Sequence, residues 1–254
     1  MSGLHIEVRG TGPDLVLLHG WGLHGGLFRS LADRLAPHFR LHLVDLPGHG
    51  RSVMPEGDYT LASIAAYIAA HVPAHAAWLG WSLGGRVALM AAINGAAISR
   101  LILIGANPAF IQRDDWPHGM PAAELQQFAD ALRDDYKSTL QRFLAVQSRG
   151  SERAREELRA LRDELFAHGE PHPEALAGGL EILRGADLRE HLAAIQQPVL
   201  VIHGERDTLA PIAAAEFTAR SLPHGRLLAI PGAGHAPFIS HPDQVVAALL
   251  EFLA

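Results

Sequence analysis

Ser82 lies in the pentapeptide Gly-Trp-Ser-Leu-Gly at residues 80–84, which follows an apolar run and precedes a helical pattern. A serine flanked by two glycines, between a strand and a helix, is typical of a sharp turn that presents the hydroxyl as a nucleophile. Gly85 then lets the start of the helix pack closely. This context predicts nucleophilic catalysis of acyl transfer by Ser82.

A serine hydroxyl needs a base to take its proton, and the base needs a carboxylate to orient it. Asp207 lies just past an apolar run at residues 199–203, and His235 lies just past another at residues 226–230. Because ligand sites of open α/β sheets gather at the carboxyl ends of strands, the three side chains can converge. We therefore predict a catalytic triad of Ser82, His235 and Asp207.

Two residues compete for the roles of base and carboxylate. Glu205 could replace Asp207, but a residue so close to the strand end favours a solvated turn position. His241 could replace His235, but the sequence Ser-His-Pro around it is typical of a helix start, so we interpret His241 as a capping residue.

The tetrahedral intermediate of acyl transfer needs two backbone N–H donors at the developing oxyanion. Leu83, directly after the nucleophile, is predicted to supply the first. The loop at residues 19–22, His-Gly-Trp-Gly, follows an early strand, and we predict that the Trp21 N–H supplies the second. The side chains of Trp21 and Trp81 could form an apolar wall for an acyl chain, or Trp81 could simply pack in the core.

Apolar runs and helical patterns alternate along most of the chain. Continuous apolar runs favour strands that are buried on both faces of a parallel sheet, and the alternation predicts a doubly wound α/β fold. The predicted strands are residues 15–19, 41–45, 77–81, 101–105, 199–203 and 226–230, and the predicted helices are residues 27–36, 61–71, 84–94, 212–221 and 242–253.

The alternation stops between residues 116 and 187, where apolar residues recur at helical spacing. We predict an inserted helical cap at residues 116–187, and a core domain made of residues 1–115 and 188–254. Turn-rich flanks are expected where such an excursion leaves and rejoins a sheet.

The composition excludes several functional classes. Without cysteine, the chain has no disulfide and no thiolate metal site, and its histidines, including the pair His71 and His75, lack a ligand set. A net charge of −6 argues against nucleic acid. No signal peptide or membrane span is recognisable. We expect a monomeric cytoplasmic protein that binds no membrane, no metal and no cofactor.

These motifs resemble those of the α/β-hydrolase superfamily: residues 19–22, the Asp-Leu-Pro-Gly-His-Gly-Arg-Ser of residues 45–52, residues 80–85, the Gly-x-x-Asp of residues 204–207, and Gly234-His235. A narrower resemblance, carried by residues 115–117, 142–147, 178–183, 187–189 and 235–242, is to the esterases of biotin synthesis that act on the methyl ester of pimeloyl-[acyl-carrier protein]. Within that pattern His49 departs, because a bulkier apolar residue is common there.

The resemblance implies hydrolysis of that methyl ester to pimeloyl-[acyl-carrier protein] and methanol, with the acyl carrier protein as partner. It also implies the same triad and a substrate site lined by nine residues. They are Trp21, Ser82, Leu83, Phe143, Leu144, Ala145, Val146, Gln147 and His235.

Basic residues of the cap could dock an acidic carrier protein. Arg155 and Arg159 are four residues apart and so share a helix face, and Arg142 precedes them. We interpret these three as a docking surface. The alternative is that interleaved acidic residues, Glu157 among them, pair with the arginines on an ordinary solvated helix.

Other functions of the same fold stay open from sequence. A generalist short-chain carboxylesterase or a carbon–carbon bond hydrolase would use the same triad. A ligand receptor with a slow, vestigial triad is a non-enzymatic alternative.

Overall fold

The computed structural model describes residues 3–254, in which one mixed sheet has the strand order β1-β3-β2-β4-β5-β6-β7. Every neighbouring pair is parallel except β1 with β3. The strands are β1 (Ile6–Arg9), β2 (Asp14–Leu18), β3 (Arg40–Val44), β4 (Ala77–Trp81), β5 (Leu101–Ile104), β6 (Val199–Gly204) and β7 (Gly225–Ile230).

The strands of the sheet centre are the continuous apolar runs of the sequence, buried along almost their whole length. Helices cover both faces, which explains why these strands show no alternation of polar and apolar residues. The edge strand β1 was missed from sequence because its four residues, Ile-Glu-Val-Arg, are only partly buried and mix polar with apolar side chains.

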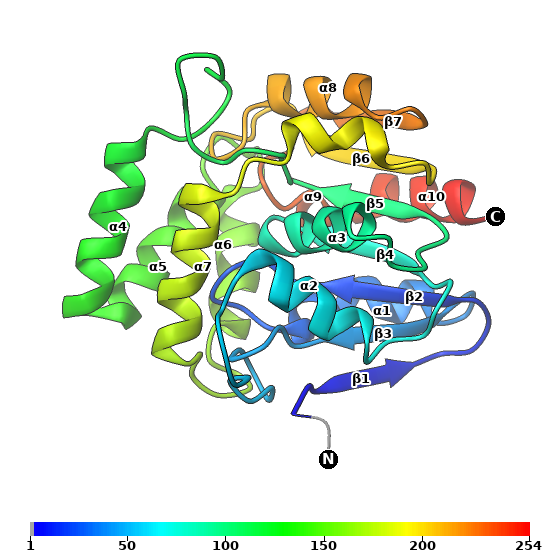
Figure 1. The fold of residues 1–254 in the computed structure, drawn as a ribbon, viewed down its shortest axis with the longest axis horizontal. Coiled ribbons are helices and arrows are strands. Elements are labelled where there is room, and N and C mark those ends of the chain that lie inside the picture. Colours follow the sequence, from blue (N-terminus) through cyan, green and yellow to red (C-terminus); the bar gives the residue numbers. More distant parts are fainter. Residues whose placement is uncertain (1–2) are drawn as a thin grey trace.

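The helices of the core domain form two layers around the sheet (Figure 1). One layer holds α2, α3 and α8, and the other holds α1 and α10. Their bounds are α1 (Arg29–Leu35), α2 (Leu61–Ala69), α3 (Leu83–Ile93), α8 (Ile212–Ser221) and α10 (Pro242–Leu253), with shorter turns η1 (Gly25–Phe28), η2 (Arg189–Ala194) and α9 (Pro237–Ser240). The helix predicted at residues 27–36 is thus a 3₁₀ turn followed by α1.

Four helices lie between β5 and β6, beyond the carboxyl ends of the parallel strands (Figure 1). They are α4 (Ala122–Asp134), α5 (Tyr136–Gln147), α6 (Ala154–Glu164) and α7 (Pro173–Gly185), and we call residues 116–187 the cap segment. Asp135 separates α4 from α5, since its carboxylate accepts a hydrogen bond from the Ser138 N–H and so begins a new helix.

The buried Arg86 of α3 binds the chain before the cap segment and the end of the cap segment itself. The guanidinium donates to the backbone and side-chain oxygens of Asn107 at 3.3 and 3.2 Å, and to the Ala186 carbonyl at 2.6 Å. Ala109 and Asp187 form an isolated antiparallel bridge next to it. Burial lowers the pKa of Arg86 to about 10, which leaves it charged at neutral pH. No helix among residues 3–254 is long and apolar enough to cross a membrane.

Candidate active site

Ser82 occupies a strained turn between β4 and α3. Its φ of 54° and ψ of −117° are unusual for a residue with a side chain, and the turn holds because the Ser82 N–H donates to the Ile104 carbonyl at 2.9 Å. A Cβ on Gly80 would lie 2.4 Å from the Gly84 oxygen, and one on Gly84 would lie 2.2 Å from the Leu18 oxygen. Both flanking glycines are therefore required by the close packing of the backbone.

The structure brings Ser82, His235 and Asp207 together. His235 Nε2 lies 3.0 Å from Ser82 Oγ, and His235 Nδ1 lies 2.8 Å from Asp207 Oδ2. A carboxylate can only accept, so Nδ1 carries the proton and Nε2 faces the hydroxyl with its lone pair. Ser82 is 9% exposed and His235 1% exposed, which makes this a sheltered site.

The Asp207 carboxylate is held by three further contacts. The N–H groups of Leu209 and Ala210 donate to Oδ1 at 2.9 Å each, and His203 Nε2 lies 3.2 Å from Oδ2. Burial alone would raise the pKa of Asp207, but His235 and His203 outweigh it and hold the pKa well below its usual range. The residue is therefore a permanent anion beneath the imidazole.

His203 is a contact of the site that the sequence reasoning missed. It is the fifth residue of β6, is fully buried, and its Nε2 also lies 2.6 Å from the Ala210 carbonyl. Burial lowers its pKa, yet the Asp207 carboxylate outweighs this and the net direction is upward. His203 could have been identified from its position in the sequence, because it lies at the end of a predicted strand and four residues before the predicted carboxylate.

The rivals for the triad lie elsewhere. Glu205 is exposed, as predicted for a solvated turn residue. His241 does occupy the position before α10, but the prediction that its side chain caps the helix is wrong. Its Nδ1 lies 2.9 Å from Ser240 Oγ instead, because the ring turns toward α9.

The two predicted oxyanion donors lie on the segments expected. Neither the Trp21 N–H nor the Leu83 N–H has a hydrogen-bond partner within residues 3–254, which leaves both free to donate to a ligand. The Gly20 backbone approaches the nucleophile so closely that a Cβ there would lie 3.3 Å from Ser82 Cβ. The loop and the start of α3 therefore face the same small space.

The two tryptophans near Ser82 are both buried and are fixed by different contacts. Trp21 Nε1 donates to the Leu176 carbonyl of α7 at 2.9 Å, and its ring packs edge-on against Phe143 of α5. Trp81 Nε1 donates to the His235 carbonyl at 2.9 Å. Trp21 thus faces the cap segment, whereas Trp81 packs against His235.

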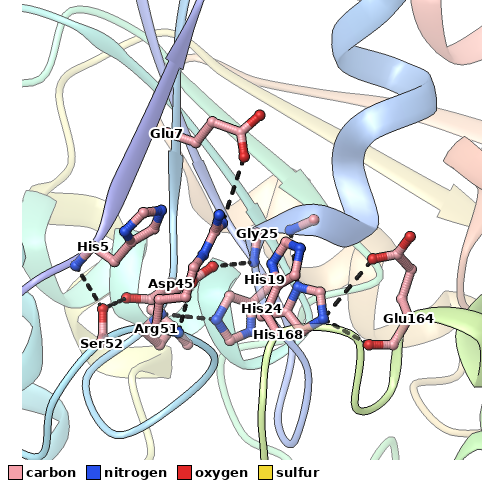
Figure 2. A network of polar contacts seen from close by, with 12 residues as sticks. His5, Glu7, His19, His24, Gly25, Asp45, Arg51, Ser52, Glu164 and His168 are labelled. Carbon is pink, nitrogen blue, oxygen red and sulfur yellow. Dashed lines mark hydrogen bonds and ion pairs between the residues drawn. The ribbon is translucent and has the colours of Figure 1, made fainter.

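A buried polar network holds the loop that carries Trp21 (Figure 2). His19 Nε2 accepts from the Leu46 N–H at 2.8 Å, so its Nδ1 is protonated and donates to the Gly20 carbonyl at 2.7 Å. Asp45 accepts from the Gly25 N–H at 2.8 Å and from the Arg51 N–H at 2.9 Å. These bonds fix both ends of the segment between residues 19 and 25.

The substrate-lining residues predicted in α5 divide into two groups. Phe143, Leu144 and Gln147 are buried, whereas Ala145 is exposed and Val146 is half-buried. Gln147 is notable because neither of its amide atoms has a partner. A pocket of about 430 Å³ lies between α4 and α5, lined by Glu124, Gln127, Phe128, Ala131, Arg142, Ala145, Val146 and Arg149.

The arginines predicted to dock a partner, Arg142, Arg155 and Arg159, are all exposed. Arg159 lies 3.8 Å from Asp163 on the same helix, the kind of pair that the alternative interpretation expects. Glu157, in contrast, does not pair with any of them. For Glu157 the alternative interpretation is wrong, because its side chain is fully buried.

Within residues 3–254 no group of three or more acidic or histidine side chains is arranged to hold a metal ion. The site is instead an assembly of a hydroxyl, an imidazole, a carboxylate and two free N–H groups. This set can activate a serine and stabilise an oxyanion.

Comparisons with known proteins agree with this chemistry. The family model described as the alpha/beta hydrolase fold matches residues 13–242. A protein of Xanthomonas oryzae pv. oryzae, named pimeloyl-[acyl-carrier protein] methyl ester esterase, is 50% identical over 251 residues, which cover 99% of each chain. The chain belongs to the pimeloyl-[acyl-carrier protein] methyl ester esterase family of α/β hydrolases.

A second member of this esterase family, from Stenotrophomonas maltophilia, is 47% identical over 251 residues, which cover 99% of this chain and 96% of the relative. Among solved structures, an esterase from Exiguobacterium antarcticum has a TM-score of 0.87 and 26% identity, covering 98% of this chain and 94% of its own. The predicted family, fold class and enzyme class are confirmed: the protein is a carboxylic ester hydrolase.

Proposed function

We propose that this esterase hydrolyses the methyl ester of pimeloyl-[acyl-carrier protein] in biotin synthesis, through an acyl-enzyme on Ser82. The observation that carries the chemistry is the continuous chain from Ser82 Oγ through His235 to Asp207, with bonds of 3.0 and 2.8 Å. The family membership carries the substrate.

The proposed reaction has two halves. His235 Nε2 takes the proton of Ser82 as Oγ attacks the ester carbonyl, and the Trp21 and Leu83 N–H groups stabilise the oxyanion. The imidazolium then protonates the departing methoxide, which leaves as methanol. Water attacks the acyl-enzyme after giving a proton to His235, and Ser82 recovers that proton as the pimeloyl carboxylate is released. No cofactor takes part.

Replacing Ser82 by Ala tests the nucleophile directly. We expect turnover of a short p-nitrophenyl ester and the initial burst of p-nitrophenol to fall to background, while the melting temperature stays close to that of the parent. Turnover near the parent rate in the Ser82→Ala variant would refute the triad.

Contacts between the cap segment and the loop of residues 19–22 support a proposal for the position of the substrate. Phe143 packs edge-on against Trp21 with ring centroids 4.9 Å apart, and Phe128 packs edge-on against Phe143 at 5.4 Å. These rings form an aromatic path from the oxyanion loop toward the pocket between α4 and α5. We propose that the acyl chain follows this path, with residues 143–147 and Leu83 around it.

The same pocket suggests where the carrier protein sits. Arg142 of α5 and Arg149, just past its end, line it, and no ion pair among the described residues engages either guanidinium. Exposed, unpaired arginines at a pocket rim attract an acidic partner and raise its rate of association. We propose that Arg142, together with Arg155 and Arg159 of α6, docks the acyl carrier protein.

Charge reversal of Arg155 and Arg159 to Glu tests this docking surface. We expect kcat/KM for the carrier-bound methyl ester to fall by about tenfold or more, most strongly at low salt, with a free methyl ester unaffected. Arg220→Glu is the matched control, because Arg220 pairs with Glu216 across one helical turn at 3.8 Å, as Arg159 pairs with Asp163. Equal losses on the carrier-bound and free esters would contradict docking.

Three further expectations stay predictions from the sequence. They are the division into a core domain (residues 1–115 and 188–254) and a cap (residues 116–187), a monomeric state, and a cytoplasmic location. The carbon–carbon bond hydrolase and the receptor gain no support from the relatives, which are esterases by name. A generalist esterase is distinguished by comparing carrier-bound with simple methyl esters.

A further inference from the structure

Glu157 is a fully buried carboxyl group on α6 of the cap segment. Its Oε1 accepts a hydrogen bond from Ser151 Oγ at 2.8 Å, whereas its Oε2 has no hydrogen-bond partner. A buried carboxyl without a cationic partner costs several kcal/mol when it is ionised, so its presence calls for an explanation. The mechanism described above makes no use of it.

The free oxygen of Glu157 faces the loop that carries His235. A Cβ on Gly234, the residue before the histidine, would lie 3.5 Å from Glu157 Oε2. The segment that leads into α6 is bound to the same loop, because the Glu152 N–H donates to the Gly232 carbonyl at 2.9 Å. The Glu152 carboxylate also pairs with Arg206 at 3.2 Å. The start of α6 is thus fixed against residues 232–235.

The charged groups that act on Glu157 belong to the triad. Burial raises the pKa of Glu157; the hydroxyls of Ser240 and Ser151 and the charge of His235 oppose this rise, and Asp207 adds to it. The neighbouring basic residue Arg153 is directed away, toward Glu156 at 3.9 Å. Burial lowers the pKa of His241, beside α9, and Arg153 lowers it further while Glu152 opposes this. Burial also lowers the pKa of His24, which precedes η1; His168 lowers it further, and Glu164 opposes this.

We infer that Glu157 is a positioning residue for the reaction, which acts through His235 from the cap side as a second, remote anion that favours the imidazolium. This inference rests on the proposed triad. Asp207 is hydrogen-bonded to His235, whereas Glu157 approaches the preceding residue from α6. The imidazolium that forms when Ser82 is deprotonated therefore feels the charge of two carboxylates, one in contact and one more distant. The basicity of His235 then depends on whether α6 is packed against residues 232–235.

Glu157→Gln tests this role, because the amide keeps the shape of the side chain and removes its charge. The measurement is kcat/KM and kcat for a short p-nitrophenyl ester between pH 5 and pH 9. We expect the midpoint of the acidic limb to move to lower pH by about 0.5 unit, because the protonated form of His235 loses a nearby anion. We also expect kcat on the plateau to fall by about three- to tenfold.

The matched control is Glu156→Gln, which removes the same charge one residue away on the exposed face of α6. It is expected to leave both the midpoint and the plateau unchanged. A merely structural role of Glu157 would lower the melting temperature without moving the midpoint, and an unmoved midpoint in Glu157→Gln overturns the inference.

Ser151→Ala gives an independent reading if Glu157→Gln does not fold. Loss of the hydroxyl donor makes the charged form of Glu157 less favourable, so the midpoint should move in the same direction by a smaller amount; no movement again counts against the role. Activity in Ser82→Ala would remove the triad itself, whereas an inactive Ser82→Ala with an unmoved Glu157→Gln midpoint would remove only the part assigned to Glu157.

Discussion

At the scale of single residues, the histidine of the triad is fixed at three points. Its Nδ1–H donates to Asp207, its Nε2 faces Ser82, and its own carbonyl accepts the Trp81 indole N–H at 2.9 Å. A catalytic base has to be held within a few tenths of an ångström of its working position. Trp81 therefore contributes to the site through its polar atom as well as through its packing.

Trp81→Phe should separate those two contributions. The ring still fills most of the space, but the His235 carbonyl loses its donor in a buried setting, which costs about 1–3 kcal/mol. We expect that loss of stability in urea unfolding together with a several-fold lower kcat for a short ester. Trp78→Phe is the control, since Trp78 is equally buried in β4 but has no bond to His235. Equal kcat values for the two variants would contradict the role of the indole.

At the scale of elements, α3 connects the nucleophile to the cap segment. Its first residue, Leu83, offers a proposed oxyanion donor, and one turn later Arg86 binds the carbonyl of Asn107, before the cap segment, and that of Ala186, at its end. A guanidinium can bridge two separate acceptors in fixed directions, which an ammonium group cannot do.

Arg86→Lys should therefore not behave as a conservative change. We expect a loss of about 2 kcal/mol or more in the free energy of unfolding, because buried carbonyls lose charged donors. Limited proteolysis should also cut faster within residues 107–122. Arg184→Lys on α7, which only pairs with Glu181 on the surface, is the control. Unchanged stability and cleavage in Arg86→Lys would show that the ends of the cap segment are held by other contacts.

The sequence predicted the central elements well and the edges poorly. The apolar runs of β4 and β6 are buried on both faces and leave a signal that does not depend on their partners. The strand β1 and the turn α9 leave almost none, since β1 is defined by its pairing with β3 and α9 is a single turn. For the same reason the break at Asp135 was missed: helical spacing continues through it.

The site shows the same division. Ser82, Asp207 and His235 could be predicted because each follows a strand within a short motif. Glu157 could not, since it occurs among exposed charged residues, and only the packing of α6 onto the histidine loop shows which of them points inward.

At the scale of the whole molecule, buried histidines give the fold a dependence on pH. His49 is fully buried beside His19, a member of the network in Figure 2, with the two ring centroids 5.4 Å apart. Burial lowers the pKa of His49 to about 4 and that of His19 to about 3. The unfolded chain takes up these protons near pH 6.5, whereas the folded protein resists them until pH 4 or 3. The contribution of these two histidines to the free energy of unfolding is therefore complete above pH 6.5 and is lost progressively as the pH falls from 6.5 toward their pKa values in the folded protein.

His49→Phe should weaken that loss. The free energy of unfolding is expected to change little at pH 8, and its decline between pH 6.5 and pH 4 should lessen by up to ~1.4 kcal/mol per pH unit. Chemical unfolding at half-unit steps measures this slope. His71→Phe, on the exposed surface, serves as the control and should leave the slope unaltered. An unchanged slope in His49→Phe would mean that other groups govern acid unfolding.

The bridge between Ala109 and Asp187 places the chain that leads into the cap segment beside the end of that segment. The sheet is therefore connected to the inserted helices through two neighbouring stretches of chain, whatever the length or sequence of the insertion. Evolution can then lengthen, shorten or exchange the intervening helices as one cassette, altering which acyl group is admitted without rebuilding the machinery that cleaves it. Exchanging the inserted helices between related esterases would reproduce such a change in the laboratory.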